Sequence, residues 1–153
     1  CPADRKAVAE VKGLEPLPRN IVSFLEASGY CYLGYALPTE EDGLAFVETY
    51  QTLMKSGKGL PKGMDLVTSQ GKNLPVLKDG VERRYIQNTN DPAATARALA
   101  TIPVIVERPK AHEGGANVLY MDGHVEFVRY PGTYPMTERF IKAMESIQVL
   151  RGK

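Results

Sequence analysis

Apolar residues recur along the chain with two different periods, and this predicts both helices and strands. Over residues 40–55 they fall three and four positions apart, at Phe46, Val47 and Tyr50, as on one face of an amphipathic helix. Thr39 comes directly before three acidic residues, a sequence typical of a helix N-cap followed by acids that the helix dipole favours. The pattern therefore predicts a helix near residues 40–55.

Two further helices are indicated by their first residues. Asp91 followed by Pro92 is typical of an N-cap and a first helical position, and opens an alanine-rich helix near residues 92–100. Thr137 is expected to cap a third helix near residues 137–149. The apolar side chains of this last helix, expected to be buried, are Phe140, Ile141, Met144 and Ile147.

Several short segments have the composition of strands. Residues 30–37 are rich in aromatic side chains and stop before Pro38, which indicates a strand. The uninterrupted apolar run at residues 104–106 suits a central strand. The weaker candidates are residues 64–69, 74–77 and 81–87. The third of these would follow an Asp-Gly turn and form a hairpin with residues 74–77.

The clearest strand signal is a β-hairpin over residues 117–128. Two alternating segments flank Asp122 and Gly123, and this dipeptide supplies the positive φ angles that a two-residue type I′ turn requires. In that register four apolar side chains would lie on the same face of the hairpin, the face expected to be buried. They are Val118, Tyr120, Val125 and Phe127.

Length and composition fit one α+β domain that spans residues 1–153 and contains an antiparallel sheet. The chain has 43% hydrophobic and 24% charged residues, as an ordinary globular protein has. A formal net charge of +1 gives no electrostatic reason to expect nucleic acid as a partner. No run of eighteen apolar residues is present, so we expect no transmembrane segment within this chain.

The two cysteines, Cys1 and Cys31, lack the neighbouring ligands that a zinc site needs. They could pair as a disulfide in an oxidising compartment, where closing the loop would contribute roughly 3–4 kcal/mol. In the alternative, Cys31 is a small buried hydrophobic residue of a strand. Because the chain begins at Cys1 rather than Met, we expect a processed product or a fragment of a longer protein.

The hairpin also carries a recognisable string. His112 is followed by nine residues and then by Asp122 and Gly123, with Ile-Pro-Val before this stretch and Glu-Phe-Val-Arg-Tyr-Pro after it. This resembles the signature of the prepilin-type processing-associated His-x9-Asp-Gly family. The match is dense over residues 88–135, and Asn90-Asp91-Pro92 and the Cys-Pro-Ala-Asp start also look like family features.

The resemblance implies a pilin-like head domain, as in pseudopilins or minor pilins of type II secretion-like systems. Such proteins begin with a leader and a long hydrophobic helix, which this sequence lacks. The resemblance implies an extracytoplasmic location, in the periplasm or at the cell surface. It also implies partners that are other protein subunits, either further copies or different chains, and a structural role. We expect no cofactor, although the resemblance to major pseudopilins, which hold calcium in a C-terminal loop, gives calcium some support.

Two interpretations of the signature residues compete. In the first they are structural: His112 bonds backbone carbonyls or the Asp122 carboxylate, and Asp122 holds the turn. The residues with this structural role would be His112, Asn117, Asp122, Gly123 and His124. In the second they bind a metal such as calcium through Asp122, a histidine (His112 or His124) and Glu113, although calcium prefers clustered oxygen ligands.

Catalytic chemistry has little support in the sequence. No serine lies in a Gly-x-Ser-x-Gly turn, so no hydrolase nucleophile is indicated. A pairing of Cys31 with His112 or His124 stays open, although an alternating aromatic strand is a poor setting for an activated thiolate. We therefore expect no enzyme. A proline-rich aromatic loop is instead a candidate contact with a neighbouring subunit, through Tyr130, Pro131, Tyr134 and Pro135.

Overall fold

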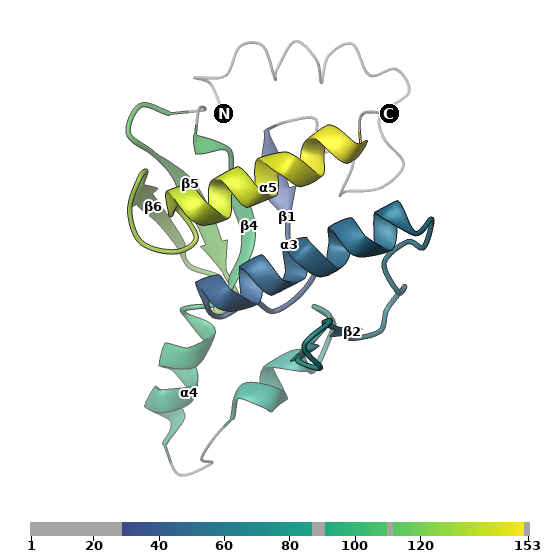
Figure 1. Ribbon diagram of the computed structural model, residues 1–153. Coiled ribbons are helices and arrows are strands. Elements are labelled where there is room, and N and C mark those ends of the chain that lie inside the picture. The colour runs from purple at the N-terminus through teal and green to yellow at the C-terminus, as the bar shows by residue number, and fades with distance from the viewer. Residues whose placement is uncertain (1–28, 87–90, 110–111, 152–153) are drawn as a thin grey trace, which may run out of the picture.

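A four-stranded antiparallel sheet forms the centre of the protein (Figure 1). The computed structural model describes residues 29–86, 91–109 and 112–151. The sheet has the strand order β1-β4-β5-β6. The strands are β1 (Tyr30–Tyr32), β4 (Pro103–Glu107), β5 (Gly115–Tyr120) and β6 (Val125–Arg129). The predicted central position of residues 104–106 is confirmed, because β4 lies between β1 and β5.

The three predicted helices are present, and with the sheet they confirm the α+β class. They are α3 (Glu40–Lys55), α4 (Pro92–Leu99) and α5 (Glu138–Arg151). The hydroxyl of Thr39 accepts from the Asp42 amide at 3.2 Å, and the carboxylate of Asp91 accepts from the Ala94 amide at 2.9 Å. The hydroxyl of Thr137 likewise accepts from a backbone amide of α5. These bonds satisfy amides that the helix itself leaves without an acceptor.

The hydrophobic core lies between the sheet and the two long helices, α3 and α5, which cover one of its faces (Figure 1). Phe140 of α5 is fully buried and packs against α3, where Gly43 leaves room for its ring. Each large apolar side chain buried in this way stabilises the fold by about 1.5–3 kcal/mol. The other fully or nearly fully buried members include Leu37, Leu74, Val118 and Met136. Within the described residues, no helix is both long and apolar enough to cross a membrane.

The hairpin is confirmed, but its register differs from the predicted one by one residue. Leu119 rather than Tyr120 lies opposite Val125, and the Tyr120 amide donates to the His124 carbonyl at 3.0 Å. Three residues therefore form the loop. Gly123 has a φ of 92°, whereas Asp122 does not have a positive φ, because among the described residues only glycines do. This geometry excludes the type I′ turn and matches a three-residue loop with glycine in the left-handed position.

The register decides which side chains of β6 reach the core. Val125 and Phe127, predicted to be core residues, instead lie on the opposite face and are 63% and 48% exposed. Val128 takes the core position and is 7% exposed. Because side chains alternate along a strand, a shift of one residue moves the whole set from one face to the other.

The segment that precedes α4 also departs from the prediction. Residues 81–87 were expected to form a strand, but Val81–Tyr85 is a short 3-10 helix, η1. Gly80 has a φ of 85°, and the Val81 amide donates back to the Lys78 carbonyl at 3.0 Å. The chain therefore continues from the turn into a 3-10 helix and does not reverse to form a strand paired with the preceding one. A small second sheet pairs β2 (Leu66–Val67) with β3 (Asn73–Leu74). β2 lies within the predicted strand 64–69, whereas β3 shares only Leu74 with the predicted strand 74–77.

The first predicted strand, residues 30–37, is interrupted. Strand β1 ends at Tyr32, and Gly34 with a φ of 76° turns the chain. Tyr35 then pairs with Val76 in an isolated bridge. The aromatic segment thus pairs with the main sheet through β1 and, through Tyr35, with the segment that follows β3.

Candidate functional site

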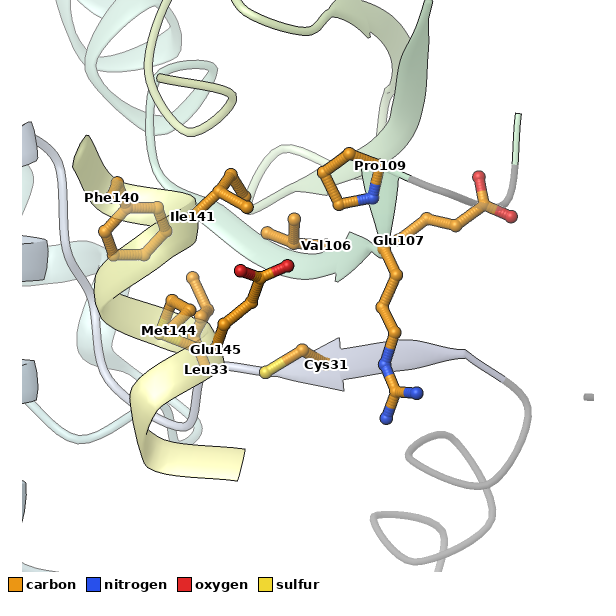
Figure 2. Close-up of a pocket in the computed structure, with 10 residues that line it drawn as sticks. Cys31, Leu33, Val106, Glu107, Pro109, Phe140, Ile141, Met144 and Glu145 are labelled. Carbon is orange, nitrogen blue, oxygen red and sulfur yellow. The ribbon is translucent and has the colours of Figure 1, made fainter. Parts of the chain in front are cut away.

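A buried carboxylate lies at the end of the central strand, and the polar groups of the hairpin converge on it. Glu107 is the last residue of β4 and is only 1% exposed. Its Oε2 accepts from the Asn117 amide at 3.1 Å and from Asn117 Nδ2 at 2.9 Å, and lies 3.1 Å from His112 Nε2. Figure 2 shows the carboxylate directed away from the cavity beneath α5, because side chains alternate across the sheet.

These contacts explain how a charge can be buried there. A carboxylate removed from water is costly unless hydrogen bonds satisfy it, and Oε2 of Glu107 accepts two bonds from Asn117 beside the His112 ring. The other oxygen, Oε1, is buried without a hydrogen-bond partner among the described residues. His112 Nε2 lies 3.1 Å from Glu107 Oε2 and 3.3 Å from Asn117 Nδ2, so the tautomer of the ring decides whether this nitrogen donates to the carboxylate or accepts from the amide. Burial raises the pKa of Tyr30, which lies opposite Glu107 in the sheet, and the negative charge of Glu107 raises it further.

The cluster joins segments that are close in sequence but belong to different strands. His112 forms an isolated bridge with Gly115, at the start of β5, and its ring meets Phe127 of β6 edge-on with centroids 6.2 Å apart. The Glu107 cluster, meaning Glu107, His112 and Asn117, therefore fixes β4 against the open end of the hairpin. What it offers chemically is a fixed network of hydrogen bonds.

The other end of the signature forms the hairpin turn. Asp122 Oδ1 accepts from the His124 amide at 3.1 Å and lies 2.6 Å from His124 Nδ1. The bond from the backbone amide, and then the bond from the ring, hold the pKa of Asp122 below its ordinary value. The His124 ring stacks on Tyr120 with centroids 4.6 Å apart. The residues of the turn thus fix its shape.

The predicted contact between His112 and Asp122 is wrong. His112 precedes β5 and Asp122 follows it, and at about 3.3 Å per residue this strand separates them by roughly 17 Å. The predicted metal set of Asp122, His112 and Glu113 is not formed for the same reason. In the part of the chain that the structure describes, no three His, Cys, Asp or Glu side chains gather closely enough to hold a metal ion.

Cys31 belongs to the opposite face of the sheet from His112. It lines a cavity of about 220 Å³ between α5 and strands β1 and β4, and its sulfur faces α5 (Figure 2). His124 follows the turn into β6, whereas β1 is the other edge of the sheet. A Cys–His pairing of the kind left open above is thus not formed with either histidine. Cys1 lies outside the described residues, so its disulfide with Cys31 stays a prediction.

The aromatic loop before α5 mostly serves the core. The Tyr134 hydroxyl donates to the Leu37 carbonyl at 2.9 Å, and Pro135 is fully buried. Tyr130 packs against the hydrophobic core, whereas Pro131 is exposed. The predicted subunit contact is therefore corrected for Tyr134 and Pro135, whose side chains fill the interior of the domain.

Among the signature residues, the structure brings together His112 and Asn117 at one end of β5, and Asp122, Gly123 and His124 at the other. Sequence reasoning missed Glu107, which is the acceptor for the first group. Its signal was a lone acid that ends an apolar strand, Pro-Val-Ile-Val-Glu. Comparisons of the chain with family models, curated proteins and solved structures gave no match.

Proposed function

We propose that this protein is a non-catalytic assembly domain that binds other protein subunits outside the cytoplasm. Its role would be that of a pseudopilin-like head in a type II secretion-like or pilus-like system, or of an accessory subunit in a larger extracytoplasmic complex. The resemblance of residues 112–123 to the His-x9-Asp-Gly signature supports the family and the location. The exposed outer strand of the sheet supports the binding of another protein.

The observation that carries the proposal is the apolar surface of β6. Val125 and Phe127 are exposed on an edge strand, on the face of the sheet away from the core. Val125 continues a row of directly opposed side chains that crosses all four strands, made of Tyr32, Ile105, Leu119 and Val125. Exposed apolar edge strands promote association, and soluble proteins usually protect them.

The positions of the signature residues are consistent with this role. One group fixes the open end of the hairpin through Glu107, and the other shapes its turn through Asp122. The Asp122 group holds the turn between β5 and β6, and the His112 ring packs against Phe127 of β6. The signature would then maintain a binding surface, and its histidines would have no part in a reaction.

A second function, a metal- or ligand-binding module, has one observation in its favour. Asp122 orients the His124 ring through Nδ1, and Nε2 lies 4.0 Å from a Glu126 carboxylate oxygen. A carboxylate that orients a histidine in this way is common beside bound metals. Thermal melting with EDTA, with calcium and with zinc tests this function, because a ligand that binds only the folded state raises the melting temperature.

The experiment that tests assembly is native mass spectrometry of the protein isolated from its own source, with Phe127→Asp as the variant. Val67→Asp is the control, since Val67 is an apolar strand residue of the small sheet that is 63% exposed, against 48% for Phe127. We expect the unaltered chain and the control to be isolated with other subunits in a fixed ratio, and Phe127→Asp to be isolated without them. A lone monomer in all three cases contradicts the proposal.

A further inference from the structure

We propose that the partner at β6 is a second copy of this chain, added edge to edge so that the two sheets become one. This inference rests on the proposed function, because it uses the same exposed strand. It adds the identity of the partner and the register of the contact.

The backbone groups of β6 alternate between its two sides. The pair Tyr120–His124 is hydrogen-bonded, and the Tyr130 amide donates to the Gly114 carbonyl. Counting in steps of two along β6, residues 124, 126, 128 and 130 thus direct their backbone groups toward β5. The amides of Val125, Phe127 and Arg129 and the carbonyls of Val125 and Phe127 point to the open edge, and no backbone bond from another described segment reaches them. The Arg129 carbonyl lies against Gly132 instead.

An antiparallel pair of identical strands has few registers that use these groups. With Phe127 opposite itself, Val125 lies opposite Arg129 of the other copy, and the open groups form about four backbone hydrogen bonds. A register centred on Glu126 would place two like charges opposite each other, which is destabilising. A register centred on Val128 would place Val125 opposite Pro131, which has no amide proton.

The side chains fit the register centred on Phe127. Each Phe127 ring lies over Gly115 and meets His112 edge-on, and on pairing its exposed side would face the Phe127 ring of the other copy. The aliphatic stem of Arg129 would cover Val125 of the other copy while its charged end stays in water. The formal net charge of +1 means that two copies repel each other only weakly. A two-fold axis through Phe127 thus buries the two most exposed apolar residues of the main sheet.

Sedimentation analysis of the purified full chain tests the self-pairing. We expect a monomer–dimer equilibrium, and we expect Phe127→Asp to raise the dimer dissociation constant by about tenfold or more, since two aspartates would then face each other. Val125→Lys should act in the same direction, because the lysine would lie opposite Arg129 of the other copy. Val67→Asp changes a valine of equal exposure away from β6 and should leave the constant unchanged. Circular dichroism of each variant establishes that it is folded.

A cross-link tests the register itself. Hydrogen-bonded antiparallel residues have Cα atoms about 5.5 Å apart, which suits a disulfide. In a Cys1→Ser background, Phe127→Cys is expected to form a covalent dimer under mild oxidation, whereas Val67→Cys is not. Equal cross-linking of both variants, or of neither, overturns the register.

The two proposals fail in different ways. A wild-type chain that stays monomeric at its highest soluble concentration, with no cross-link at position 127, overturns the self-pairing. Assembly through β6 still stands in that case if Phe127→Asp loses the other subunits isolated from the source. If the variant changes neither self-association nor isolation with other proteins, both proposals fall.

Discussion

Glu107 combines nearly complete burial with three polar contacts, so its removal should be more costly than that of an exposed acid. In Glu107→Ala, the amide and side chain of Asn117 and the ring of His112 lose their common acceptor. We expect a loss of about 1–3 kcal/mol in the free energy of unfolding, because partly buried donors are left without a partner. Urea denaturation at neutral pH measures this loss.

The control for this variant is Glu126→Ala. Its side chain is 63% exposed on the edge strand β6, so the change should stay within about 0.5 kcal/mol. Glu107→Gln keeps one acceptor oxygen and should lie between the two. If Glu107→Ala is as stable as the control, the cluster does not fix the hairpin, and the structural interpretation of His112 and Asn117 loses its basis.

At the scale of single residues, the sequence identified the signature residues but could not show which residues they contact. Asp122 was correctly expected to shape the turn, because its bond to an amide two residues on is a local property. The partner of His112 depended on how β4 lies beside β5, and this is a long-range contact. Sequence spacing suggested Asp122, and the sheet supplies Glu107 instead.

The packing of α3 on α5 depends on the missing side chain of Gly43. A Cβ atom there would lie 2.5 Å from the Phe140 ring, which is fully buried. We expect Gly43→Ala to destabilise the protein by about 1–3 kcal/mol through overpacking, despite the gain of about 1 kcal/mol in helix propensity. Thermal or urea unfolding measures the balance.

Two further variants make the Gly43 prediction specific. Gly59→Ala places a methyl group in open space and should be nearly neutral. A combined Gly43→Ala and Phe140→Leu variant should be more stable than the sum of the two single effects, since the smaller side chain relieves the contact. Additive effects would show that the two helices do not meet at these residues.

Asp65 connects β2, β3 and η1 and should make this part of the molecule sensitive to acid. It forms an ion pair with Arg84 and accepts from Asn73 Nδ2 at 3.0 Å and from the Val76 amide at 3.1 Å. The bond from Arg84 contributes most to lowering its pKa from 3.8 to about 2. A carboxyl group with a lowered pKa stabilises the fold above its unfolded value and loses that effect as the pH falls.

We therefore expect stability to fall between about pH 4 and pH 2 more steeply in the unaltered chain than in Asp65→Asn. Arg84→Gln should also flatten this slope, because it removes the largest cause of the lowered pKa. Urea midpoints measured across this pH range give the slopes. Identical slopes in all three proteins would mean that Asp65 has the same pKa in the folded and unfolded chains.

At the scale of elements, the local signals were reliable where they involved caps and periodicity. Thr39, Asp91 and Thr137 each lie at the start of a helix, as expected. The errors came from Asp-Gly turns. This dipeptide suits both two-residue and three-residue hairpin loops, and only the packing of Val128 in the core selects between them. After Gly80, the same signal leads into η1 rather than into a strand.

Across the whole molecule, the tyrosines are placed so that the folded state should resist their ionisation. Burial is the first cause of the raised pKa of each of six, Tyr30, Tyr32, Tyr35, Tyr85, Tyr120 and Tyr134. The rise is largest for Tyr134, whose hydroxyl donates to the Leu37 carbonyl between two distant segments. A raised pKa means that the folded state favours the neutral form of the tyrosine hydroxyl.

The consequence is a loss of stability at alkaline pH. Below the ordinary tyrosine pKa of about 10 both states are neutral, and above it the unfolded chain ionises first and is favoured. We expect unfolding and tyrosinate absorbance to rise together above about pH 10, in one cooperative step. Tyr134→Phe should reduce this slope, although losing its hydrogen bond costs about 1 kcal/mol at neutral pH. An absorbance that rises near pH 10 while circular dichroism stays native would show that these hydroxyls are open to solvent. The core that places β6 at the surface would then be packed differently.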